Sequence, residues 1–185
     1  MLTLTCSGTG VMEAAVVNLF SKKEKVLVIN TGNFGQRFAE IAAAYELDVI
    51  DLKYKWGSTY DLDHIKAVIS ENSDLKGIFM THSETSTGVL NDIQRVGNLT
   101  KDTDILLVVD SVSGMVVNPL EFDDWSLDCV IAGSQKGFLL PPGLAFITLS
   151  EKAKKAMERS DLPKFYFDLK KYIKFLKEKQ QNSYT

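Results

Sequence analysis

A single lysine, Lys136, lies in a turn of small and polar residues that spans positions 132–137 and reads Ala-Gly-Ser-Gln-Lys-Gly. The turn follows the apolar run 129–131, which is typical of a buried strand. No other charged residue lies within several positions of Lys136. An amine delivered to the end of a sheet among small neighbours can react covalently with a carbonyl group. A solvated loop lysine fits the same pattern, so this interpretation depends on what the rest of the chain places nearby.

Several other residues with chemical potential also follow predicted strands directly. Asp110 comes after the most apolar run, 105–109, and carboxylates are common at strand ends in α/β folds. Ser7, Gly8 and Thr9 form a turn that opens an apolar helix, where free N–H groups and the helix dipole favour an anion. A plain strand-to-helix turn has the same composition. Each feature is therefore weak when it is taken alone.

Two further turns carry an aromatic ring and a hydroxyl group. Phe34 lies among small residues after the apolar run 26–30, where its ring either faces a cleft or packs as a structural aromatic. Thr85 lies in the run 82–88, which follows the predicted strand 77–80 and is unusually rich in hydroxyl groups for a simple turn.

The elements that must position these residues alternate between strand and helix along the whole chain, without an internal repeat or a low-complexity linker. This alternation predicts an α/β fold with a mostly parallel sheet and helices on both faces, in three layers. The predicted strands are 2–6, 26–30, 49–52, 77–80, 105–109, 128–131 and 144–149, and the predicted helices are 11–20, 38–45, 62–69, 92–99, 150–159 and 166–179. Ligands of such sheets bind at the carboxyl ends of the strands, so we expect the five turns to converge on one crevice.

One cofactor, pyridoxal 5′-phosphate (PLP), requires all of these parts together. The turn 7–9 suits its phosphate, Phe34 can stack on its ring, and Thr85 can donate to its phenolic oxygen. Asp110 can keep the pyridine nitrogen protonated, because a charge pair at ~4 Å and an effective dielectric of ~20 contributes about 4 kcal/mol, or about three pKa units. Lys136 supplies the amine for a Schiff base with the aldehyde.

Five motifs that occur in order along the chain carry a resemblance to a known family. They are 7–15 (Ser-Gly-Thr-Gly-Val-Met-Glu-Ala-Ala), 33–37 (Asn-Phe-Gly-Gln-Arg), 84–88 (Glu-Thr-Ser-Thr-Gly), 110–113 (Asp-Ser-Val-Ser) and 133–136 (Gly-Ser-Gln-Lys). The chain resembles the class V aminotransferases of PLP fold type I, the branch that includes alanine–glyoxylate, serine–pyruvate and 2-aminoethylphosphonate aminotransferases. The resemblance covers nearly the whole chain.

The resemblance assigns roles to individual residues. It implies that Lys136 is the Schiff-base lysine and the general acid/base of transamination, and that Asp110 pairs with the pyridine nitrogen. It further implies that Val112 packs under the ring and that Ser134 and Gln135 lie near the phosphate and ring. Many family members have tryptophan where this chain has phenylalanine in the second turn.

The chain also departs from the family pattern. Family members begin with an N-terminal segment and end with a smaller domain whose arginine grips the substrate carboxylate, and Arg37, Arg95 and Arg159 do not match that position. The final residues, Tyr184 and Thr185, resemble a motif whose threonine reaches the phosphate of the partner subunit's cofactor. We therefore expect a fragment with a PLP-binding large domain over 1–163 and, over 164–185, a helix leading toward an absent small domain. The family's shared active sites imply a homodimer.

The expected reaction is transfer of an amino group between a small amino acid, or an aminophosphonate, and a 2-oxo acid such as pyruvate or glyoxylate. A cysteine desulfurase-like PLP lyase is an alternative, but those enzymes usually carry His-Lys where this chain has Gln135-Lys136. They also need a mobile cysteine, whereas Cys6 and Cys129 belong to apparent strands. A non-catalytic α/β domain, nucleotide-binding or requiring a partner to assemble, stays open for the fragment.

Composition narrows the remaining classes. The 185 residues carry a net charge of −3, which gives no reason to expect nucleic acid or an anionic membrane as a partner. No apolar run reaches the ~20 residues of a membrane span. His64 and His82 stand apart from other metal-ligand residues, so no metal is expected. The two cysteines are interpreted as buried thiols, and the expected location is the cytoplasm.

Overall fold

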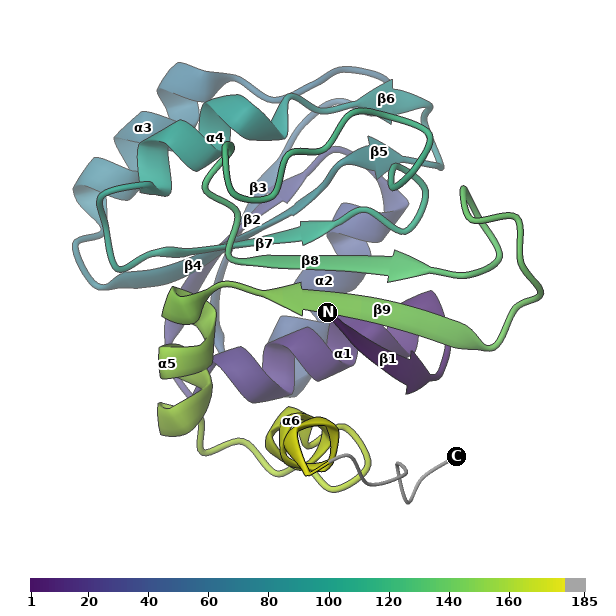
Figure 1. The fold of residues 1–185 in the computed structure, drawn as a ribbon. Helices are drawn as coiled ribbons and strands as arrows, with labels where there is room; N and C mark the ends of the chain where they lie inside the picture. Colours follow the sequence, from purple (N-terminus) through teal and green to yellow (C-terminus); the bar gives the residue numbers. More distant parts are fainter. Residues whose placement is uncertain (179–185) are drawn as a thin grey trace.

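In the computed structural model, residues 1–178 are described, and they form a central sheet with helices on both sides (Figure 1). The strands are β1 (Leu2–Thr5), β2 (Lys25–Asn30), β3 (Asp48–Lys53), β4 (Leu75–Thr81), β5 (Ser83–Glu84), β6 (Val89–Leu90), β7 (Leu106–Asp110), β8 (Cys129–Gly133) and β9 (Leu144–Leu149). The helices are α1 (Gly8–Leu19), α2 (Asn33–Ala44), α3 (Leu62–Glu71), α4 (Ile93–Thr100), α5 (Glu151–Arg159) and α6 (Leu169–Lys177).

The main sheet has the strand order β1-β9-β8-β7-β4-β2-β3. Strands β8, β7, β4, β2 and β3 are parallel to one another, while β9 runs antiparallel between β8 and β1. The predicted mostly parallel sheet is therefore confirmed. Strand β9 is antiparallel to β8, and β1 is antiparallel to β9, so β1 points in the same direction as β8. The carboxyl end of β1 therefore lies at the same edge of the sheet as those of β8, β7, β4 and β2. The turns that follow these strands thus share one edge.

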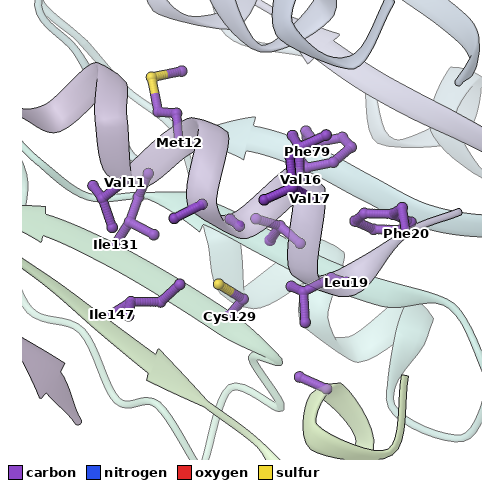
Figure 2. Close-up of a cluster of buried hydrophobic side chains, with 14 of the residues drawn as sticks. Val11, Met12, Val16, Val17, Leu19, Phe20, Phe79, Cys129, Ile131 and Ile147 are labelled. Atoms are coloured by element: carbon purple, nitrogen blue, oxygen red, sulfur yellow. The ribbon is translucent and has the colours of Figure 1, made fainter. Parts of the chain in front are cut away.

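Two apolar cores cover the two faces of the sheet, and alternate strand residues belong to different cores. In β4, for example, Phe79 belongs to the core that includes residues of helices α1, α2, α5 and α6, whereas Ile78 and Met80 belong to the core that includes residues of α3 and α4. This is the period-2 pattern of a strand that is buried on both faces. Figure 2 shows the first core, in which Val16 of α1 and Phe20, the C-cap of this helix, lie over the sheet near Phe79. The three layers predicted from the sequence are present.

Three predicted segments differ from the observed elements in a way that bears on the site or the core. Helix α2 begins at Asn33 instead of at position 38, so Phe34 lies in its first turn and not in a loop. The hydroxyl-rich run 82–88, for which no strand was predicted, contributes one strand to the small antiparallel hairpin β5–β6. Helix α6 begins at Leu169 instead of at position 166, after the cap Asp168. The apolar residues of α6 complete the core under α1, and the expected division of the chain at residue 163 stays a prediction.

Candidate active site

A cavity of about 210 Å³ lies at the carboxyl edge of the sheet, where the turns after β1, β2, β4, β7 and β8 meet. The sequence-predicted residues that line it are Ser7, Gly8, Thr9, Phe34, Thr85, Asp110, Val112, Gln135 and Lys136. These residues come from five separate stretches of the chain. The structure thus brings together nine of the predicted site residues, while their roles toward a cofactor stay predictions.

The turn after β1 forms the start of helix α1. Ser7 is its N-cap, and the Ser7 hydroxyl accepts a hydrogen bond from Gly10 N at 3.2 Å. The first turn of α1 contains no acidic side chain, so the positive end of the helix dipole is not neutralised there. This end of the helix lines the cavity and can bind an anion such as a phosphate.

Asp110 ends the central strand β7 and is only 3% exposed. Its Oδ1 atom accepts a hydrogen bond from Val112 N at 2.9 Å, and no ion pair to Asp110 occurs among residues 1–178. Burial is the main cause that raises the pKa of Asp110 to about 6, and nearby Glu84 acts in the same direction. The hydrogen bond from Val112 N and the positive charges of Arg37 and Lys136 act in the opposite direction. A buried carboxylate of this kind is stabilised by a cation placed against it.

Lys136 follows β8 in an exposed turn and lines the cavity. Ser134, two residues earlier, is fully buried and does not line the cavity. Its hydroxyl donates to Pro141 O at 2.6 Å and accepts from Leu144 N at 3.3 Å. Ser134 therefore holds together the loop that carries Lys136, and the cofactor contact implied by the resemblance stays a prediction.

Arg37 is a cavity residue for which the sequence suggested no role. Its guanidinium lies over the Phe34 ring, 4.8 Å from the centroid, and donates to Thr9 Oγ1 at 3.0 Å. It thus joins the first turn of α2 to the first turn of α1. The sequence pattern that could have identified Arg37 as a cavity residue is its i, i+3 spacing from Phe34. This spacing places the two side chains on one helix face only when the helix begins before Phe34.

Three further lining residues were not predicted: Met12, Ser83 and Ser113. The hydroxyls of Thr85 and Ser113 lie 2.7 Å apart, so these two side chains share a hydrogen bond at the cavity wall. Ser113 lies three residues after Asp110, and this position in the sequence could have identified Ser113 as a cavity residue. Thr185, the remaining predicted site residue, lies outside the described residues.

Other features bear on the class of site. Among residues 1–178, no group of three or more His, Cys, Asp or Glu side chains is arranged to hold a metal ion. Within the same part of the chain, every helix is too short or too polar to span a bilayer. Cys6 and Cys129 are free thiols that do not line the cavity, and burial raises the pKa of Cys6 to about 11. Neither cysteine is placed to act on a ligand in the cavity.

The fold and the cavity together define a domain of the aminotransferase type. The crystal structure of alanine–glyoxylate aminotransferase from Nostoc sp. has the same arrangement, with a TM-score of 0.93 and 28% identity over 99% of this chain and 49% of that chain. The model of the family "Aminotransferase class-V" matches residues 3–173. The chain therefore belongs to the class V aminotransferase family.

Curated relatives agree with this assignment. An uncharacterized aminotransferase of Methanocaldococcus jannaschii is 41% identical over 183 residues, which are 98% of this chain and 48% of that protein. Serine–glyoxylate aminotransferase of Methylorubrum extorquens is 38% identical over 174 residues, covering 88% of this chain and 42% of that protein. The chain spans about half the length of the curated relatives that it matches.

Membership of this family implies pyridoxal phosphate as the cofactor, and the residues at the cavity fit it. The buried Asp110 favours a cationic ring nitrogen, and the start of α1 favours an anionic phosphate. Lys136 is an exposed amine at the same cavity. When bound, the cofactor would supply an aldehyde for this amine and an electron-withdrawing ring.

Proposed function

We propose that this chain is the cofactor-binding part of a PLP-dependent aminotransferase. The proposed substrates are a small amino acid, or an aminophosphonate, and a 2-oxo acid such as pyruvate or glyoxylate. The single observation that carries the proposal is that Lys136 and the buried Asp110 line one cavity with the positive end of α1. The names of several relatives, which are glyoxylate aminotransferases, support the choice of acceptor.

Each of these residues has a distinct task in the proposed reaction. Lys136 holds the cofactor covalently and, once released, moves the proton at the substrate Cα atom. Asp110 keeps the ring nitrogen protonated by its negative charge in a site of low dielectric. The start of α1 binds the phosphate and fixes the orientation of the ring. A desulfurase is disfavoured, because neither described cysteine faces the cavity.

The proposal is tested by adding PLP to the purified chain and recording its absorbance after exhaustive dialysis. We expect a retained band at about 400–430 nm, as for a lysine-linked cofactor. Lys136→Ala should lose this band completely, because Lys136 is the only lysine among the described residues that line the cavity. Lys101→Ala is the matched control, since Lys101 is exposed after α4, before β7, and away from the cavity. A band that persists in Lys136→Ala would show that the PLP is attached elsewhere, and no band in the parent chain would overturn PLP binding.

We further infer that the protein is a cytoplasmic homodimer. Four apolar side chains are exposed beside the Lys136 turn: Val116 (61% exposed), Val117 (66%), Leu139 (90%) and Leu140 (49%). We call them the mouth patch. Gly137 packs directly against the backbone of Met115, so the two turns that form the patch are contiguous. Exposed apolar patches of this kind are typical of protein interfaces, and a buried free thiol, Cys129, is typical of reducing compartments.

A further inference from the structure

Glu84 is a fully buried carboxylate that lies one residue before Thr85, and Thr85 lines the cavity. Its Oε2 atom accepts hydrogen bonds from Phe34 N at 3.0 Å and Gly35 N at 3.2 Å. Its Oε1 atom accepts from Ser86 N at 3.2 Å and Ser86 Oγ at 2.6 Å. All four of these bonds converge on one side chain, which links the turn after β2 to the turn after β4.

The same contacts complete the start of helix α2. The first N–H groups of a helix have no partner within it, and the N-cap residue of α2, Gly32, has no side chain to supply one. Ser86 Oγ accepts from Asn33 N at 2.9 Å, and Glu84 accepts from the next two amides. The first three amides of α2 are thus capped by residues about 50 positions away. The negative charge of Glu84 also complements the positive end of the helix.

Gly32 shows that the site is built around this carboxylate. A Cβ atom at Gly32 would lie 2.6 Å from both Glu84 Cγ and Ser86 Oγ, which is closer than side chains can pack. The main chain at Gly32 is extended, so its glycine is required for this close approach and not for its backbone conformation. The Glu84 side chain therefore occupies a slot that only a glycine leaves open.

We infer that Glu84 is a positioning residue, which clamps the Phe34 turn to the Thr85 turn so that the aromatic ring and the hydroxyl group hold fixed positions across the cavity. The role of these two residues toward PLP rests on the proposed function. Glu84 does not line the cavity itself, so it acts through its neighbours. A neutral amide cannot replace it, because either orientation of glutamine turns an NH₂ group toward two N–H or O–H donors.

The inference is tested with Glu84→Gln, in which only one carboxylate oxygen is replaced. Because the clamp is lost, we expect amide hydrogen exchange at Phe34 and Gly35 to become at least tenfold faster than in the parent chain. We also expect the dissociation constant for PLP to rise at least tenfold, with an altered circular-dichroism band per bound cofactor. Ser86→Ala removes the hydroxyl that accepts from Asn33 N, so it should accelerate amide exchange at Asn33. Because Ser86 is exposed, this variant provides a second test if Glu84→Gln does not fold.

Asp128→Asn is the matched control. Asp128 is also a buried carboxylate, and it accepts from Leu107 N at 2.9 Å, Ser150 Oγ at 2.7 Å and Lys152 Nζ at 2.9 Å, outside the cavity. The Asp128→Asn variant should lower the stability of the protein without changing its affinity for PLP or the amide exchange at the start of α2. The inference is overturned if Glu84→Gln and Ser86→Ala behave like this control. If the parent chain binds no PLP, the proposed function fails, whereas the exchange data still decide whether Glu84 clamps the two turns.

Discussion

At the scale of single residues, Asp110 shows how the site balances stability against function. Its carboxyl group is buried next to one backbone donor, and burial raises its pKa from 3.8 to about 6. The folded protein therefore binds this proton more tightly than the unfolded chain does. Ionising Asp110 destabilises the ligand-free fold, with no penalty below pH ~4 and the full penalty above pH ~6. A cationic ligand would remove that penalty.

Asp110→Asn should therefore stabilise the ligand-free protein at neutral pH. Two pKa units correspond to about 3 kcal/mol, so we expect a gain of about 3 kcal/mol at pH 8 and about 1.5 kcal/mol at pH 5. The asparagine oxygen can still accept from Val112 N, which keeps the turn intact. Urea denaturation at the two pH values measures the difference. A variant that is less stable than the parent at pH 8 would contradict this account, and the same variant should bind PLP more weakly.

At the scale of elements, helix α4 is fitted to the loop that precedes β8. Gly97 lies in its interior and is buried, and a Cβ atom there would collide with the carbonyl oxygen of Trp125. Helix propensity alone favours alanine over glycine by about 1 kcal/mol. The contact is with backbone, which cannot rotate away as a flexible side chain could. Packing should therefore outweigh propensity at this position.

We expect Gly97→Ala to destabilise the protein by about 1–3 kcal/mol, against the sign of helix propensity. Thermal unfolding followed by far-ultraviolet circular dichroism measures the change. Asn98→Ala is the control on the exposed side of the same helix, where the substitution should be neutral or slightly stabilising. If Gly97→Ala is as stable as the parent protein or more stable, the loop around Trp125 moves to accommodate the methyl group. The close approach would then not require glycine at position 97.

At the scale of the whole molecule, the mouth patch is an exposed apolar surface next to the turn that carries Lys136. Val116 and Leu139 both have positive φ angles, 74° and 56°, which are unfavourable for these residues. Both side chains are also exposed. A second subunit that covers the patch would bury this apolar surface and hold the strained turns beside Lys136.

The double variant Val117→Asp, Leu139→Asp should weaken self-association at least tenfold, because it places charges in an apolar interface. Sedimentation velocity over a range of concentrations measures the change. Trp56→Asp is the control, since Trp56 is also an exposed apolar side chain (61% exposed) but lies in the loop before α3. A parent chain that is monomeric at all accessible concentrations would refute a dimer of this chain, and a double variant that still dimerises would place the interface elsewhere.

The sequence by itself determined the fold class and most of the cavity. Strands and helices alternate in a pattern that only a mostly parallel sheet satisfies, and the carboxyl ends of such strands meet at one edge. Asp110 and Lys136 could therefore be placed at a common site from local patterns. Their chemistry depends on residue type and on position after a strand, and both are visible in the sequence.

The tertiary structure alone decided how the turns are joined. Helix α2 begins at Asn33 because Glu84 and Ser86 cap amides about 50 residues away, and no local pattern reveals such a cap. Arg37 reaches the cavity for the same reason, and Ser134 turns into its own loop because Pro141 and Leu144 supply its partners. Side-chain hydrogen bonds over long sequence separations depend on which strands are neighbours and in which register. The sequence pattern places the residues at the edge of the sheet, and the packing of the turns decides which of them face the cavity.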